Sequence, residues 1–160
     1  HFPGHQFIVA GAPSISPGFY EKHLDGTGVG IVYDQTYPLL KNARAAVVTS
    51  GTATLETALL NVPEVVIYKT SPVTFFVGNF LVNIKYFSLV NLILDKEAVK
   101  ELLQDNLAGD IKSELDKLLF DEAYRASMMQ HYKLLREKLG EPGVADKVAG
   151  RIHALIHNTL

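Results

Sequence analysis

The sequence predicts an α/β fold in which a parallel sheet carries helices on both faces and is followed by a helical tail. Short apolar runs alternate with short segments of helical pattern, which is typical of strands joined by right-handed crossovers. From Ala108 onward, apolar residues recur only at helical spacing. With 160 residues, 48% of them hydrophobic, the chain is long enough to bury a core of its own.

The first part of the chain contains two predicted strands and two predicted helices, all short. The strands are expected at Phe7–Ala10 (FIVA) and Gly28–Tyr33 (GVGIVY). The first helix is expected at Pro17–His23, because proline is well tolerated at the first helical position. The second is expected at Thr36–Ala43, immediately before the next apolar run.

The central stretch, AAVVTSGTATLETALLNVPEVVIY, indicates one complete strand–helix–strand unit. Ala45–Val48 is an apolar run that suits a strand buried on both faces. A helix is expected from Thr52 to Leu60, where Asn61 and Pro63 end it. The next buried strand is Glu64–Tyr68. The polar turn of this unit therefore lies at the carboxyl end of a strand.

This turn is predicted to bind an anion. The first amides of a helix have no intrahelical partner and carry the positive end of the helix dipole. Gly51 lets a phosphate approach the backbone, while Ser50, Thr52 and Thr54 add hydroxyl donors. Glu56 follows Thr52 by four residues and shares its helix face, so its carboxylate could accept hydrogen bonds from a ribose diol.

A simpler interpretation of the same turn is helix capping. Ser50 or Thr52 would then cap the helix, and Glu56 would be a solvated charge. Glu56 does not complete a capping box, because position 53 is alanine rather than serine or threonine. The residues alone leave ligand binding and capping both open.

The most apolar segment is Ser71–Val82 (SPVTFFVGNFLV). A membrane-spanning helix needs roughly 20 residues, so a segment of about a dozen is too short to span a bilayer. We expect either a buried helix packed on the sheet or an apolar patch that contacts lipid or acyl chains. Lys69, Lys85 and Tyr86 would suit the edge of such a patch.

Asn91 stands alone among apolar residues in YFSLVNLIL. A buried asparagine needs hydrogen-bond partners, which could be the backbone of a turn or a ligand. The following segment, Lys96–Gln104 (KEAVKELLQ), has Val99, Leu102 and Leu103 on one helical face, so we expect it to begin the helical tail.

Composition excludes several classes of protein. The chain has no cysteine, which rules out disulfides and cysteine-based metal sites, and no other metal-ligand cluster is predicted. A net charge of −2 lacks the basic excess of a nucleic-acid binder. The first residues do not form a signal peptide. Because the first residue is not methionine, we expect a piece of a longer protein.

The ordered set SGTATLE, YKTSPVT and SLVNLIL resembles the lipid-A-disaccharide synthase family, with the same intervening lengths. The resemblance is close over Ala45–Gln104 and looser on either side. Val90 stands where the family usually has proline, and Leu94–Asp95 replaces a common Ala-Gly.

The resemblance implies the carboxyl-terminal, donor-binding Rossmann-like domain of a GT-B type glycosyltransferase. The implied reaction transfers an acylated glucosamine from its UDP derivative, UDP-2,3-diacylglucosamine, to 2,3-diacylglucosamine 1-phosphate, without a cofactor. The donor-binding residues implied are Ser50, Gly51, Thr52, Glu56 and Asn91, with Asn91 near the diphosphate. The general base is expected in an amino-terminal domain, so this chain alone is expected to be inactive.

We expect residues 1–104 to form the donor-binding domain. Residues 105–160 would form a helical tail that packs on it, on the amino-terminal domain or on a second subunit. The expected location is cytoplasmic, with peripheral contact at the inner membrane of a bacterium. Two rival functions are another UDP-sugar enzyme, such as a UDP-N-acetylglucosamine epimerase or a peptidoglycan-type transferase, and a noncatalytic self-associating domain.

Overall fold

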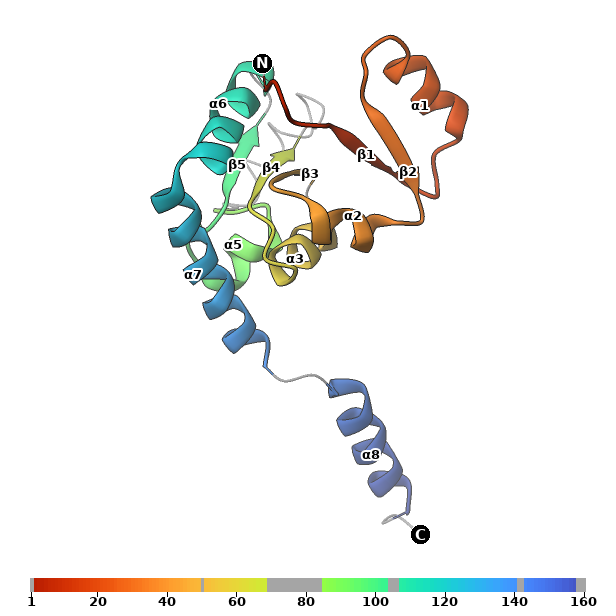
Figure 1. The fold of residues 1–160 in the computed structure, drawn as a ribbon. Coiled ribbons are helices and arrows are strands. Elements are labelled where there is room, and N and C mark those ends of the chain that lie inside the picture. Colours follow the sequence, from red (N-terminus) through yellow and green to blue (C-terminus); the bar gives the residue numbers. More distant parts are fainter. Residues whose placement is uncertain (1, 50, 69–84, 104–106, 141–142, 158–160) are drawn as a thin grey trace.

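The computed structural model describes residues 2–49, 51–68, 85–103, 107–140 and 143–157. Every strand pair among these residues is parallel, and helices connect the strands (Figure 1). The parallel α/β fold is therefore confirmed. Two predictions lie outside the described residues: the apolar segment Ser71–Val82 and the donor-binding residue Ser50.

The strands that the structure describes form two hydrogen-bonded sheets rather than one. In the first sheet, β1 (Ile8–Gly11) pairs with β2 (Gly30–Tyr33). The second has the order β3-β4-β5, in which β4 is central. Its strands are β3 (Ala46–Thr49), β4 (Glu64–Tyr68) and β5 (Lys100–Leu103).

Helices alternate with the strands, and the first three lie where the sequence predicts them. The helices up to β5 are α1 (Pro17–Leu24), α2 (Thr36–Asn42), α3 (Thr52–Leu59) and α5 (Leu89–Leu94). The predicted helical tail is also present, and its described helices are α6 (Leu107–Phe120), α7 (Glu122–Leu139) and α8 (Val144–His157).

The segment expected to begin the tail as a helix forms β5 instead. That prediction, for Lys96–Gln104, was wrong because tertiary contacts override the helical spacing of the segment. Its backbone pairs in parallel with β4, with Glu101 opposite Val66. Burial against the rest of the fold leaves Val99 only 1% exposed.

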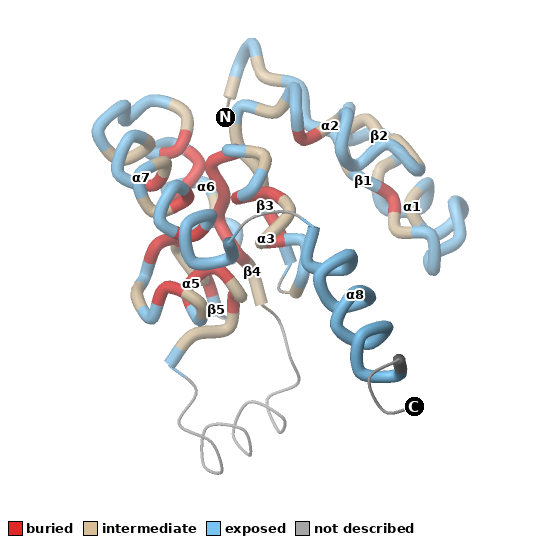
Figure 2. The backbone as a smooth tube through the Cα atoms, turned by 90° about the horizontal axis from the view of Figure 1, so that it is seen from below, coloured by how far each residue is buried: buried red, intermediate tan, exposed pale blue. Residues whose placement is uncertain are grey.

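The hydrophobic core lies around the second sheet (Figure 2). Val65 and Val66 of β4 are buried with Ala58 of α3 and Val90 of α5, and α6 and α7 complete the cluster. By contrast, α1 contributes no buried residue. The turn between β3 and α3 is thus held by the best-packed part of the molecule.

Two cations of α7 fix the far ends of α3 and α5. The Arg136 guanidinium donates hydrogen bonds to the Leu59 carbonyl and to Asn61 Oδ1, while Lys138 Nζ donates to the Ile93 carbonyl at 2.9 Å. Cations at helix C-termini also interact favourably with the helix dipole. Both helices are therefore anchored at the ends that lie away from the predicted site.

The last helix, α8, projects away from the rest of the molecule (Figure 1). Residues 144–156 are all exposed, including the apolar side chains of Val148 and Ile152. Within the described ranges, no helix combines the length and the apolar character needed to cross a membrane.

Candidate functional site

The candidate site is the turn between β3 and α3. Gly51 occupies the N-cap position with φ +122° and ψ −158°, a backbone region that is essentially restricted to glycine. No described atom lies within 4 Å of the position that a Cβ would take on this residue. The turn therefore needs glycine for its backbone angles, and the space in front of it is open.

No side chain of the described residues caps the start of α3. Thr52 is the first helical residue and is exposed, rather than being the N-cap that the capping interpretation offered. Thr54 is buried, and its hydroxyl donates to the Gly51 carbonyl at 2.8 Å, so that hydroxyl is not available to a ligand. The amides of Thr52 and Ala53 donate to no residue in the described part of the chain.

Glu56 lies one helical turn beyond Thr52 and is partly exposed. Its carboxylate makes no hydrogen bond or ion pair with any residue that the structure describes. The carboxylate is thus free of described partners and can accept hydrogen bonds from hydroxyl groups of a ligand at the turn. Its predicted role in binding stays a prediction.

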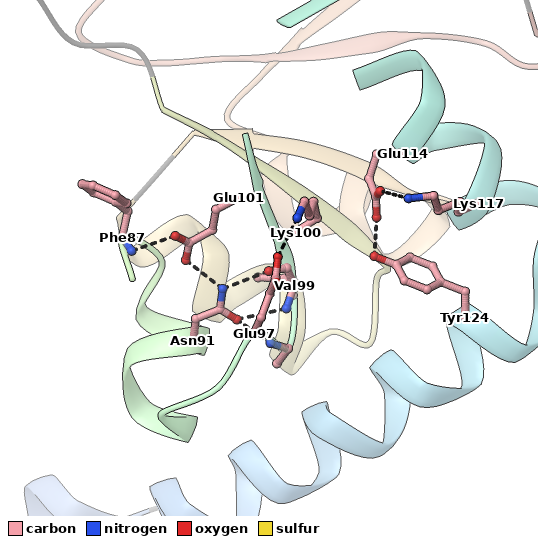
Figure 3. A network of polar contacts seen from close by, with 10 residues as sticks. Phe87, Asn91, Glu97, Val99, Lys100, Glu101, Glu114, Lys117 and Tyr124 are labelled. Carbon is pink, nitrogen blue, oxygen red and sulfur yellow. Dashed lines mark hydrogen bonds and ion pairs between the residues drawn. The ribbon is translucent and has the colours of Figure 1, made fainter. Parts of the chain in front are cut away.

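Asn91 is completely buried, and protein groups occupy its whole carboxamide (Figure 3). Its Oδ1 accepts hydrogen bonds from the amides of Ala98 and Val99 at 2.7 and 3.0 Å. Its Nδ2 donates to the Val99 carbonyl at 2.9 Å and to Glu101 Oε1 at 2.8 Å. With two donors and two acceptor positions, the group has no capacity left for a direct ligand contact here.

Protein side chains also accept hydrogen bonds from the backbone amides at the start of α5. Ser88 is the N-cap, and its Oγ accepts a hydrogen bond from the Asn91 amide at 3.2 Å. The Glu101 carboxylate accepts hydrogen bonds from the amides of Phe87 and Ser88 at 2.9 and 2.8 Å. Of these two neighbouring helix starts, α5 is capped by side chains, whereas the start of α3 is open as far as the described residues show.

Sequence reasoning missed Ser88 and Glu101. Ser88 had a local signal, because a serine three residues before Asn91 is a usual helix N-cap. Glu101 had none, since its partners lie 10 to 14 residues away in the sequence. Only the pairing of β5 with β4 brings this carboxylate to the start of α5.

A cleft of about 300 Å³ lies elsewhere, between the start of β5 and helices α6 and α7. Its charges are paired: Lys100 contacts Glu97 at 2.9 Å, and Lys117 contacts Glu114 at 3.0 Å. Burial lowers the pKa of His131, which also lines the cleft. These paired charges give the cleft no excess of either sign to attract a charged ligand.

Two further titratable side chains are buried in the core. Burial raises the pKa of Glu64 to about 9, and burial also raises the pKa of Tyr132. The Tyr132 hydroxyl lies 3.2 Å from the Val62 carbonyl and 3.4 Å from Glu64 Oε1, while Glu64 Oε2 has no partner among the described residues. Glu64 is therefore a neutral acid at pH 7.

Within the described residues, no group of three or more histidine, aspartate or glutamate side chains could hold a metal ion. The features that converge on the turn are thus an open helix start, a glycine-specific backbone and a nearby carboxylate. The parallel α/β fold with such a turn at the carboxyl edge of the sheet is Rossmann-like, and it is consistent with a domain of a GT-B type glycosyltransferase.

The chain belongs to the lipid-A-disaccharide synthetase family, because the model of that family matches residues 9–150. A lipid-A-disaccharide synthase of Geobacter sulfurreducens is 36% identical over 152 residues, which is 93% of this chain and 40% of the relative. The enzyme of Syntrophus aciditrophicus is 39% identical over 148 residues, or 90% of this chain and 39% of the relative. This chain therefore spans about 40% of the length of these relatives.

Proposed function

We propose that this chain is the donor-binding portion of a hexosyltransferase of lipid A biosynthesis. The enzyme would join UDP-2,3-diacylglucosamine to 2,3-diacylglucosamine 1-phosphate and release lipid A disaccharide 1-phosphate and UDP. Family membership supports the reaction. The open start of α3 is the single observation that carries the assignment of the donor site.

The diphosphate of the donor would bind at the turn. The backbone at Gly51 and the amide of Thr52 would donate hydrogen bonds to phosphate oxygens, with the Ser50 and Thr52 hydroxyls as further donors. Glu56 would accept hydrogen bonds from ribose or sugar hydroxyls. When the glycosidic bond to UDP breaks, the same amides would stabilise the negative charge on the departing diphosphate without a metal.

Asn91 would serve the donor site indirectly. Its hydrogen bonds to Ala98, Val99 and Glu101 support this role, because they tie α5 to β5 beside α3. The general base that deprotonates the acceptor hydroxyl is proposed to lie in the part of the full-length enzyme that this chain does not span. Turnover by this chain alone would contradict that assignment.

Two finer proposals concern partners. Acylated substrates favour a location on the cytoplasmic face of a membrane, with residues 71–82 near lipid. Residues 1–104 would form the donor-binding domain, and residues 105–160 would form the tail. The exposed apolar face of α8 supports contact of this tail with the rest of the enzyme or with a second subunit. Sedimentation of the full-length enzyme with and without α8 would test that tail contact.

Calorimetric titration with UDP tests the donor site. We expect Glu56→Ala to weaken UDP binding about 10-fold, because a hydrogen bond to a charged group contributes about 1.5–3 kcal/mol. Glu137→Ala, which removes an exposed carboxylate from α7, is the matched control and should leave the affinity unchanged. Equal UDP affinity in the Glu56→Ala variant and the unsubstituted chain would contradict the role of Glu56.

A further inference from the structure

Glu101 is the polar centre of the region where α5 meets the second sheet (Figure 3). Its carboxylate accepts three hydrogen bonds, from the amides of Phe87 and Ser88 and from Asn91 Nδ2. Hydrogen bonds to a carboxylate are shorter and roughly twice as strong as neutral ones. The backbone that leads into α5 is therefore fixed by a side chain of β5.

This fixed backbone holds an aromatic ring. Phe87 stacks on Tyr68, with ring centroids 5.1 Å apart and an interplanar angle of 22°. Tyr68 is the last residue of β4, and both side chains are partly exposed. The two rings come from segments that are joined through residues 69–86, and Glu101 fixes Phe87 by its amide.

The ring pair lies on the same edge of the sheet as the open turn. Ile67, next to Tyr68, is paired with Thr49, the last residue of β3, and neighbouring strands lie about 4.8 Å apart. Both α3 and α5 begin at this carboxyl edge, and the two helices contact each other. The Tyr68–Phe87 pair and the start of α3 thus follow neighbouring strands at the same edge of the sheet.

We propose that Glu101 is a positioning residue of the donor site, which acts by holding the Phe87 ring against Tyr68 as an aromatic wall beside the α3 turn. The wall would contact the nucleoside part of the donor, since flat rings pack well on aromatic side chains. The turn itself would bind the diphosphate. This inference rests on the proposed function.

Two probes separate the wall from the turn. Inorganic pyrophosphate can use only the turn, whereas UDP can use the turn and the wall. We expect Glu101→Gln to lower the UDP affinity about 10-fold and to change the pyrophosphate affinity less than about 2-fold, the first being a loss of about 1.4 kcal/mol. Glu97→Gln, an exposed carboxylate on the segment before β5, is the matched control and should change neither affinity.

A second variant covers the case in which Glu101→Gln does not fold. Phe87→Leu removes the ring but keeps the amide that Glu101 binds, so it should show the same loss for UDP alone. Equal loss of UDP and pyrophosphate binding, or unchanged UDP binding in a folded variant, would overturn the positioning role only. Failure of the unsubstituted chain to bind either probe would overturn the proposed donor site, and this inference with it.

Discussion

Replacement of Asn91 by alanine should destabilise the whole domain. The change removes all four hydrogen bonds of the buried carboxamide. The amide and the carbonyl of Val99 then lose the carboxamide as a partner, while the Ala98 amide keeps its hydrogen bond to the Lys96 carbonyl at 2.9 Å. Ala98 and Val99 are 6% and 1% exposed, so water cannot readily replace the lost carboxamide.

The loss of unfolding free energy can be estimated from the groups that lose a partner. Each buried group left without a hydrogen bond costs about 1–3 kcal/mol, so the two groups of Val99 imply a loss of at least about 2 kcal/mol. The free energy of unfolding of a typical domain is only about 5–15 kcal/mol. We therefore expect a large fall in the urea midpoint of the Asn91→Ala chain, followed by far-UV circular dichroism.

Asn42→Ala is the matched control for this measurement. Asn42 is exposed at the end of α2 and donates one hydrogen bond, to the Pro38 carbonyl at 2.8 Å. Its loss should cost less than about 1 kcal/mol, the usual net contribution of one such bond. If Asn91→Ala lowered the free energy of unfolding no more than Asn42→Ala does, the stabilising role assigned to the Asn91 carboxamide would be refuted.

Two further predictions concern the core acid and the turn. Burial raises the pKa of Glu64 from 4.5 to about 9, so folding favours the neutral acid. The free energy of unfolding should then fall as pH rises from 4.5 to 9. At 1.36 kcal/mol per pH unit, the fall between pH 4.5 and pH 7 is about 3 kcal/mol. Glu64→Gln should remove most of this dependence in urea titrations at pH 5, 7 and 9, and an unchanged slope would rule out a buried neutral acid. Gly51→Ala should cost about 1–3 kcal/mol of stability because alanine tolerates φ +122° poorly. It should also weaken pyrophosphate binding in calorimetry. Gly18→Ala, at an exposed glycine in α1, is the control: it should leave pyrophosphate binding unchanged and should not destabilise the chain, because alanine is favourable in a helix.

Local patterns were sufficient to predict the strand–helix–strand unit around the turn. The predicted strand Glu64–Tyr68 agrees with β4 at both ends, and the predicted helix from Thr52 differs from α3 by one residue. Here the apolar run, the glycine and the Asn61–Pro63 stop all favour the same structure. The local residues did not decide whether the start of α3 is capped, because Ser50 and Thr52 were both candidate caps.

Features that depend on distant residues could not be predicted. The helical spacing of Val99, Leu102 and Leu103 favoured a helix, but pairing with β4 makes β5 a strand. The sequence showed that Asn91 needs partners without showing which, and they come from Ala98 to Glu101. The division of the strands into two sheets likewise has no local signal.

The central claim is that the donor diphosphate binds at the start of α3. Amide chemical-shift mapping by NMR, with UDP added to the ¹⁵N-labelled chain, tests it most directly. The largest shifts should fall on Gly51, Thr52 and Ala53, whose amides are at the uncapped turn. Shifts concentrated instead on the cleft at Lys100 and Lys117, with the turn unaffected, would contradict the account.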